Sequence, residues 1–275
     1  MPQDNPSSYV LGASEHERRR LTLQGRILNP LTERFLKRAG LWAGMRILDL
    51  GCGIGDVSLI AARLVGPQGL VTGLDPDSVA LDTARKRAKE ENLLQLDFEQ
   101  GNFESYTTDR TYDAIIGRHV LIHSADAPEW IGRMVSLLRR GGIVAFQEYD
   151  LSYFPPIEPD LPLFMELREC LVELFGKATR YPDTGARLYH WMHRAGFSNT
   201  SCYGECLMDG GPESAFYEWF AETVRSVAPQ LAALGVLEAS VLELPTLALR
   251  LRDEAVSAQG CLTTPLIVSC SGERS

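Results

Sequence analysis

The chain has 275 residues and a formal net charge of −9, and 45% of its residues are hydrophobic while 23% are charged. This composition is ordinary for a globular protein. The acidic balance argues against a broad phosphate-binding face, so we expect a small-molecule ligand rather than nucleic acid. There is no run of 18 or more apolar residues and no secretion-signal pattern, which predicts a cytoplasmic protein that has no membrane partner.

Six cysteines are spread through the chain, and we expect them to be reduced and mostly buried thiols. Only Cys202 and Cys206 are close in sequence, and no second pair of cysteines or histidines accompanies them. The sequence therefore predicts no metal site.

The first 44 residues predict a helical cover. Ser14 and Glu17 have the spacing of a capping box, which marks a helix start. Asn29 followed by Pro30 has the pattern of a second helix start, and Gly40 is typical of a helix end. We therefore expect two helices before residue 45.

Between residues 45 and 150, short apolar segments alternate with segments of helical periodicity. "MRILDL" and "LVTGLD" are typical of strands buried on both faces, and "DVSLIAARLV" is typical of a crossover helix. Strand alternating with helix predicts a doubly wound, mainly parallel α/β sheet. Residues 45–150 would form its binding core.

After residue 150 the alternation gives way to longer helical segments. Residues 199–208 and 262–270 resemble two further strands, which would bring the sheet to seven. The segments at about 152–180 and 212–258 are predicted to be helical insertions that form a lid, connected through the proline-rich "FPPIEPDLP". We expect residues 151–275 to complete one integrated domain.

The stretch "ILDLGCGIGD" at residues 47–56 places three glycines directly after a predicted strand. Gly51 suits a sharp turn off the strand end. Gly53 and Gly55 would leave space above the carboxyl ends of the strands, where open α/β sheets bind ligands. The alternative is a tight turn with no ligand.

Asp75 ends the next predicted strand, where a carboxylate can accept hydrogen bonds from ribose hydroxyls. Nicotinamide-binding enzymes also place an acid there, but their fingerprint needs a glycine at the position of Asp56, whose charge would suit a pyrophosphate badly. Asp49 adds negative charge that suits a cationic ligand. A sulfonium with a ribose and an amino-acid tail fits this set.

These motifs, together with "VTGLDPD", "GNFES", "YDAIIGRHVLIH" and "RRGGIVAF", resemble the class I S-adenosylmethionine-dependent methyltransferases in order and spacing. The resemblance is greatest to the ubiquinone/menaquinone-type small-molecule branch, and it is close over residues 10–150. It implies a Rossmann-like fold, S-adenosylmethionine as cofactor and S-adenosylhomocysteine as product.

The resemblance also implies which residues contact the cofactor. They are Asp49, Gly51, Cys52 and Gly53 around the methionine part, Asp75 on the ribose, Pro76 against the adenine, Asn102 and Phe103 at the adenine edge and face, the Arg118 backbone at the amino-acid tail, and Tyr9 and Gln24 from the N-terminal segment. The family usually has aspartate where Asn102 stands, and the amide oxygen of Asn102 can still accept from the adenine amine.

Methyl transfer is an in-line displacement, so the protein must align the nucleophile, exclude water and, for some substrates, remove a proton. His119 and His123 follow the fourth predicted strand, and His123 is the better candidate base because imidazole titrates near neutrality. Glu148, at the end of the fifth strand, is the competing candidate. The structural alternatives are a histidine bonded to a backbone carbonyl and an acid that caps neighbouring amides.

We therefore expect methylation of oxygen, carbon or nitrogen on an organic small molecule, of the kind found in secondary metabolism, by a monomer or homodimer. The alternative is a protein that keeps the fold and cofactor without methyl transfer, as a cyclase or a ligand-sensing module. A nicotinamide-dependent oxidoreductase is disfavoured by Asp56.

Overall fold

The computed structural model describes residues 15–235 and 243–275, and the chain groups into two compact units. The sheet unit comprises residues 28–149, 183–204 and 267–275. The helical unit comprises the described residues of 1–27, 150–182 and 205–266. Each unit has its own hydrophobic core. That residues 151–275 complete one integrated domain with lid insertions stays a prediction.

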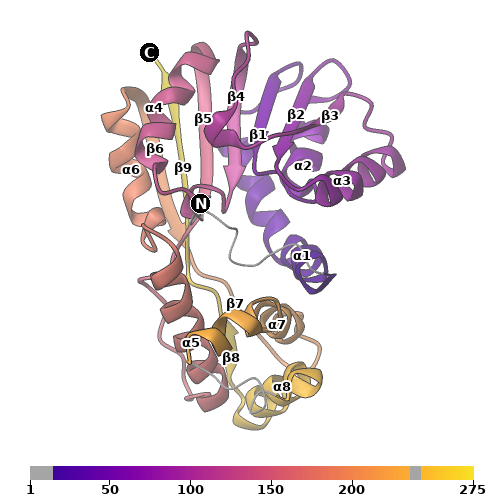
Figure 1. Cartoon of the computed structure of the whole chain (residues 1–275), viewed down its shortest axis with the longest axis vertical. Helices are drawn as coiled ribbons and strands as arrows, with labels where there is room; N and C mark the ends of the chain where they lie inside the picture. Colours follow the sequence, from indigo (N-terminus) through magenta and orange to yellow (C-terminus); the bar gives the residue numbers. More distant parts are fainter. Residues whose placement is uncertain (1–14, 236–242) are drawn as a thin grey trace, which may run out of the picture. The chain divides into compact units, whose positions relative to one another are not determined.

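A seven-stranded sheet forms the centre of the sheet unit, as the sequence predicted (Figure 1). The strands lie in the order β3-β2-β1-β4-β5-β9-β6. β1 pairs in parallel with β2 and β4, β2 with β3, and β4 with β5. The strand bounds are β1 Arg46–Leu50, β2 Leu70–Asp75, β3 Leu96–Gln100, β4 Tyr112–Arg118, β5 Leu138–Asp150, β6 Phe197–Glu205 and β9 Leu266–Arg274.

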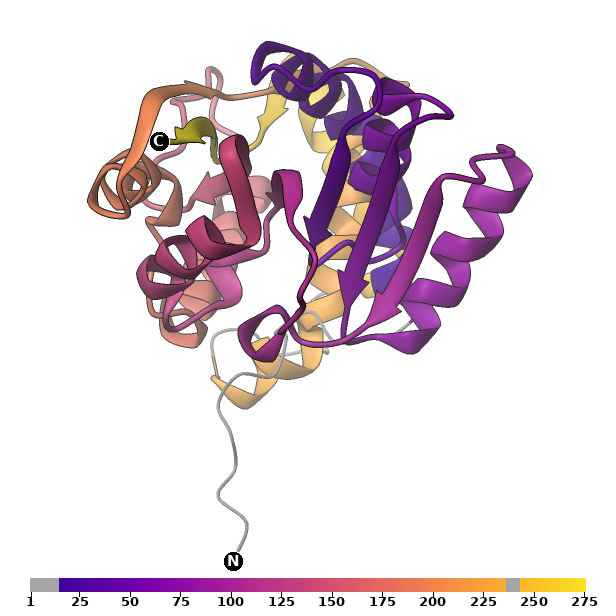
Figure 2. The ribbon, with the colours of Figure 1, turned by 90° about the horizontal axis from the view of Figure 1, so that it is seen from above.

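The central strands are buried along almost their whole length. β1 is buried at four of its five positions and β4 at six of its seven, which is typical of parallel strands covered on both faces. α2 (Asp56–Val65) and α3 (Ser78–Glu90) pack against strands of the β1–β3 half, and Figure 2 shows α3, in purple, running beside that half. α4 (Ala127–Leu137) packs against α6 (Thr184–Arg194). The strand order reverses between β1 and β4, and sheets of this kind bind ligands outside the carboxyl ends of the strands at such a point.

The N-terminal segment forms a single helix, α1 (Glu15–Arg38), where the sequence predicted two. Pro30 lies inside this helix, although a proline there removes one backbone hydrogen bond. Asn29 caps no helix, because its side chain bonds instead to Arg118 and Asp56. The Asn-Pro pair therefore serves a tertiary contact rather than a helix start.

β5 also begins earlier than predicted. Gly141 and Gly142 were expected to end the preceding helix, but α4 ends at Leu137 and both glycines lie within β5. Leu138 opposes Tyr112, and the register shifts before the next pairs. Gly141, with a φ of 70°, permits this irregularity, so the glycine pair marks a bulge rather than a helix end.

The helical unit contains the insertions, and their described parts are mainly helical as predicted. Its helices are α5 (Pro162–Ala178), α7 (Phe216–Ala233) and α8 (Leu247–Ala258), and its two-stranded antiparallel sheet pairs β7 (Met208–Gly210) with β8 (Cys261–Thr263). α5 packs against α7, with Phe164 and Phe220 edge to face at 4.9 Å between centroids. Among the described residues, no helix is long and apolar enough to cross a membrane.

Candidate functional site

The turn between β1 and α2 has left-handed backbone at all three predicted glycines. The φ angles of Gly51, Gly53 and Gly55 are 61°, 52° and 86°. A Cβ on Gly51 would lie 2.6 Å from a methyl of Val120, and one on Gly55 would lie 3.0 Å from Ala84, whereas one on Gly53 would meet nothing within 4 Å. Only Gly53 borders open space. The expectation that Gly55 leaves room for a ligand is therefore wrong, because α3 fills that room.

Asp49 lies near the carboxyl end of β1 and is 1% exposed. Its Oδ2 accepts a hydrogen bond from Ser58 Oγ at 2.5 Å, and its Oδ1 has no hydrogen-bond partner in the described part of the chain. Burial raises the pKa of Asp49 to about 7, against the lowering effects of the Ser58 bond and the Arg118 charge. A buried carboxyl group with one oxygen that lacks a hydrogen-bond partner is suited to a cationic donor such as an ammonium group.

Asp75 joins the end of β2 to the glycine turn. Its Oδ2 accepts from the Gly53 amide at 2.8 Å and its Oδ1 from the Asp77 amide at 2.9 Å. Burial raises the pKa of Asp75, and these two amide bonds oppose the rise. Each carboxylate oxygen keeps a second lone pair, so ribose hydroxyls can still donate to it. Pro76 follows and is exposed.

Asn102 precedes the short 3-10 helix η1 (Phe103–Ser105) and caps it. Its Oδ1 accepts from the Glu104 amide at 2.8 Å, so the oxygen expected to face the adenine amine already has one partner. Phe103 is half-buried and packs edge to face on Trp130, with centroids 5.5 Å apart. One lone pair of the Asn102 oxygen and the exposed part of Phe103 remain for a base.

Cys52 is a buried thiol in the same turn. Burial, followed by the charges of Asp49 and Asp75, raises its pKa well above the ordinary value. Cys52 therefore stays protonated and contributes packing and backbone groups rather than a nucleophile.

Arg118 ends β4, and its guanidinium is buried in a polar cluster. One terminal nitrogen donates to Asn29 Oδ1 at 3.0 Å and Thr32 Oγ1 at 2.9 Å, and the other lies 3.6 Å from Asp56. Asp56 also pairs with Arg87 at 2.7 Å. Two arginines thus neutralise Asp56, so its charge no longer argues against a pyrophosphate as the sequence suggested. The sequence argument against a dinucleotide-binding site then rests only on the absence of a glycine at the position of Asp56.

The loop after β4 carries both candidate histidines. His119 is half-buried with a φ of 54°, and its ring stacks on Tyr149 with centroids 3.8 Å apart. His123 is half-buried and ends the short 3-10 helix η2 (Leu121–His123). His119 and His123 therefore flank one tight turn that follows the carboxyl end of β4.

Glu148 lies near the end of β5 and is 0% exposed. Its carboxylate accepts hydrogen bonds from the amides of Val120 and Leu121, both at 2.9 Å, and of Ile122 at 3.3 Å. Burial raises its pKa to about 7 while the three amide bonds oppose the rise. The side chain thus has the geometry of the structural alternative, an acid that caps neighbouring amides.

The two remaining predicted contacts, Gln24 and Tyr9, belong to the N-terminal segment of the sequence. Gln24 belongs to the helical unit, where its side-chain oxygen accepts from Arg20 at 2.7 Å. Tyr9 lies outside the described residues. Sequence reasoning missed Ser58 and Val120, because their roles depend on tertiary contacts, of Ser58 on α2 with Asp49 on β1 and of Val120 with the space above Gly51. The only sequence signal for these residues was their position, since Ser58 follows the glycine turn and Val120 follows the end of β4.

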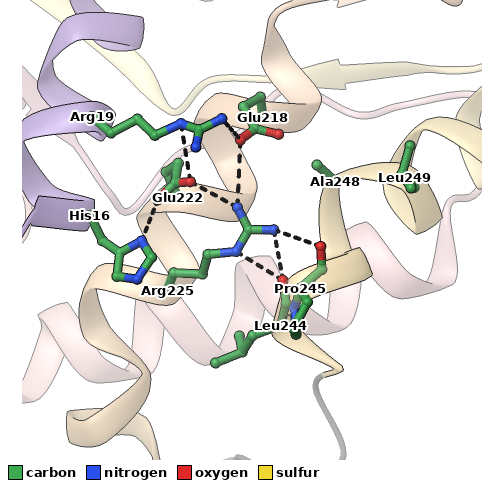
Figure 3. Close-up of a pocket in the computed structure, with 9 residues that line it drawn as sticks. All are labelled: His16, Arg19, Glu218, Glu222, Arg225, Leu244, Pro245, Ala248 and Leu249. Carbon is green, nitrogen blue, oxygen red and sulfur yellow. Dashed lines mark hydrogen bonds and ion pairs between the residues drawn. The ribbon is translucent and has the colours of Figure 1, made fainter.

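A pocket of about 520 Å³ lies in the helical unit (Figure 3). Arg19 donates to Glu218 at 2.7 Å, and Arg225 donates to Glu222 at 2.8 Å. His16 Nδ1 lies 3.0 Å from Glu222, which is 1% exposed in its side chain. The two guanidinium groups and two carboxylates neutralise one another, so the charged groups that line this pocket are already paired. Within the described residues, no cluster of three or more His, Cys, Asp or Glu is arranged to hold a metal ion.

A parallel sheet with its switch point beside a glycine turn, and an acid at the end of the next strand, define a nucleoside-binding α/β protein. The family described as "Methyltransferase domain" matches residues 41–196, more than half of the chain. The chain belongs to this family and is a class I S-adenosylmethionine-dependent methyltransferase, as the motifs predicted.

Curated relatives include methyltransferases of small organic molecules. Aklanonic acid methyltransferase DauC of Streptomyces sp. (strain C5) is 30% identical over 174 residues, which cover 60% of this chain and 76% of that protein. A demethylmenaquinone methyltransferase of Lactococcus lactis is 28% identical over 58% of this chain and 62% of its own length. The ubiquinone biosynthesis O-methyltransferase of Actinobacillus pleuropneumoniae is 34% identical over 44% of this chain and 53% of its own length.

Solved structures with the same fold include the YcgJ protein of Bacillus subtilis, with a TM-score of 0.58 at 18% identity over 89% of this chain and 98% of that chain. The [4+2]-cyclase SpnF has a TM-score of 0.53 at 20% identity, with coverages of 90% and 81%. Phosphoethanolamine N-methyltransferase 2 of Haemonchus contortus, in complex with S-adenosyl-L-methionine, has a TM-score of 0.56 at 16% identity, with coverages of 89% and 52%. These likenesses confirm the predicted Rossmann-like fold.

Proposed function

We propose that this methyltransferase transfers a methyl group to an oxygen, carbon or nitrogen atom of an organic small molecule. The observation that carries the proposal is the buried Asp49, whose oxygen without a partner among the described residues lies near the end of β1, just before the turn that holds the unobstructed Gly53. The names of the relatives, which include aklanonic acid and demethylmenaquinone methyltransferases, support a small organic substrate.

The residues around the carboxyl ends of the parallel strands fit S-adenosylmethionine. Asp49 Oδ1 would accept from the ammonium group, and the carboxylate of Asp75 would accept from the ribose hydroxyls. Asn102, Phe103 and Pro76 would face the adenine, and Gly51, Cys52 and the Arg118 backbone would line the amino-acid tail. The bound cofactor supplies a methyl group on a sulfonium that a nucleophile displaces in line.

The chain's own task is to align the nucleophile and, where the nucleophile carries a proton, to accept that proton. His123 is our first candidate for proton acceptance, since its half-buried imidazole ends the short helix that follows β4. His119 is the second candidate, and its stacking on Tyr149 restricts its ring. We do not assign this role to Glu148, the competing candidate from the sequence, because its buried carboxylate already accepts from three amides.

A second function keeps the cofactor but not the transfer. One of the structural neighbours is a [4+2]-cyclase, SpnF, and its shared fold supports a cyclase as the alternative to methyl transfer. The two functions differ in one measurable respect. Methyl transfer produces one S-adenosylhomocysteine per turnover, whereas a cyclase or sensor produces none.

The test is incubation of the purified chain with methyl-labelled S-adenosylmethionine and a substrate panel that includes aklanonic acid and a demethylmenaquinone. Transfer of label, matched by S-adenosylhomocysteine, supports the proposal. Tight cofactor binding with conversion of a substrate and no loss of the methyl group would establish the cyclase alternative. Exposed Asp82, paired with Arg85 on α3, offers Asp82→Asn as a variant that should behave as the natural chain does.

A further inference from the structure

The turn that follows β4 exposes three consecutive backbone amides to one side chain. Val120, Leu121 and Ile122 are all buried, and their amides point at the Glu148 carboxylate rather than at backbone carbonyls. Buried amides without an acceptor are costly, and successive amides of this kind form a concavity that favours an anion. Glu148 therefore supplies the acceptor that the turn requires.

The same turn is fixed on its other sides. A Cβ on Gly51 or Gly117 would lie 2.6 Å or 2.8 Å from the methyl groups of Val120, so that side chain fills the space these glycines leave. The amide of His119 donates to the Gln147 carbonyl at 2.9 Å, and its ring stacks on Tyr149. The residues on either side of Glu148 thus hold one end of the turn, and Glu148 holds its middle.

We propose that Glu148 is a positioning residue, whose carboxylate fixes the turn at residues 120–122 and thereby the directions in which His119 and His123 point. Glu148 does not take a proton from the substrate, since its oxygens are buried and occupied by amides. Its effect on turnover rests on the proposed methyl transfer, but its hold on the turn does not.

The geometric part is tested without any substrate, by amide resonances of the labelled chain. In Glu148→Gln the side-chain NH2 replaces one carboxylate oxygen, so at least one of the three amides loses its acceptor. We expect the amide protons of residues 120–122 to move upfield relative to the natural chain, and the ring resonances of His119 and His123 to move with them. Glu91→Gln, at the exposed pair with Arg63, is the matched control and should leave these resonances in place. Unchanged resonances in a folded Glu148→Gln would overturn the proposal.

The kinetic part compares Glu148→Gln and Glu148→Asp once a substrate is known. Glu148→Asp keeps the charge but shortens the side chain, so it too should release the turn. Because misplacement by about 1 Å costs about 10²-fold in rate, we expect kcat to fall by about 10- to 100-fold in both variants, with affinity for S-adenosylhomocysteine changed by no more than about threefold. The acidic limb of the pH–rate profile should stay where it is.

Loss of that limb in Glu148→Gln would make Glu148 the base and overturn the proposal, as would full kcat in a variant whose resonances have moved. If Glu148→Gln fails to fold, Glu148→Asp carries both measurements. Failure of the proposed function can be distinguished from failure of this proposal. In the first case the natural chain would form no S-adenosylhomocysteine, while the resonance experiment would still test the geometry of the turn.

Discussion

Two carboxyl groups, Asp49 on β1 and Glu148 on β5, are buried where their ionised forms are poorly solvated. Burial raises the pKa of each to about 7. Glu148 is compensated by three amide donors, whereas Asp49 has one hydroxyl donor and an open oxygen. Asp49 is therefore the group whose protonation a bound ligand can change.

We expect cofactor binding to release a proton from Asp49. An ammonium donor at Oδ1 favours the ionised form, so below pH ~7 the carboxyl must lose its proton on binding, and affinity should rise with pH between about 5 and 7. Calorimetry of S-adenosylhomocysteine binding at pH ~6, in buffers of different ionisation enthalpy, should report release of up to about one proton. Asp49→Asn should bind more weakly and release none, and Asp82→Asn should match the natural chain. Binding without proton release would remove Asp49 from the ammonium site.

Asp75→Ala should weaken S-adenosylhomocysteine binding by about 1.5–3 kcal/mol, the range for lost hydrogen bonds to a charged group. Part of this loss would come from the turn, because the carboxylate also accepts from the Gly53 amide. Asp75→Asn keeps one acceptor and should lose less. NADH should give no saturable signal in the same calorimeter. An unchanged affinity in folded Asp75→Ala would contradict the ribose assignment.

His123→Gln should lower turnover by about 10²–10⁴-fold on a substrate that must lose a proton, the usual contribution of a general base. The acidic limb of the rate profile should disappear with it, since glutamine does not titrate. The measurement is kcat against pH, with His190→Gln as control because that histidine is exposed on α6. Full turnover with an unchanged limb would make His123 structural and leave His119 as the remaining imidazole.

At the scale of elements, the sequence predicts best where one local signal is enough. The β1 strand and its glycine turn were predictable because an apolar run ended at glycines, and the acids at 49 and 75 followed from where strands end. The split of α1 at Pro30 and the helix end at Gly141 were predicted wrongly, since tertiary packing tolerated the proline and placed the glycine in a bulge. Contacts such as Glu148 to Val120 span 28 residues and depend on strand register, which no local pattern encodes.

The turn between β1 and α2 offers a matched pair of glycine substitutions. Both Gly51→Ala and Gly53→Ala impose a side chain on left-handed backbone, which costs about 1–2 kcal/mol. Only Gly51→Ala also meets a methyl of Val120, at 2.6 Å, which adds about 1–3 kcal/mol of overpacking.

Urea unfolding should therefore show Gly51→Ala to be the less stable variant by about 1–3 kcal/mol. Adding Val120→Ala should recover part of that difference as a coupling between the two sites. Equal stabilities of the two alanine variants would mean that Val120 does not fill the space above Gly51.

At the scale of the whole molecule, the chain enters and leaves the helical unit several times, at residues near 27, 150, 182, 205 and 266. Composition and periodicity predicted that the insertions are helical, and the described parts of α5, α7 and α8 agree. Composition and periodicity could not predict that each unit has its own core. That depends on which apolar faces meet, because an inserted helix can pack on the sheet or on other insertions. We propose that these helices act as a lid, and the proposal concerns how they respond when ligands bind.

That proposal predicts a two-stage pattern of hydrogen exchange. S-adenosylhomocysteine alone should slow exchange in the sheet unit, at residues 49–55 and 118–123, since residues that we propose to bind it lie there. Substrate added with the cofactor should then slow exchange in α5, α7 and α8, because a lid that excludes water from the sulfonium closes only on the complete complex. α6 belongs to the sheet unit and carries no candidate residue, so its exchange is the internal reference. If α5, α7 and α8 exchange at the same rate with and without both ligands, they are not a lid, and water must be excluded by the sheet unit alone.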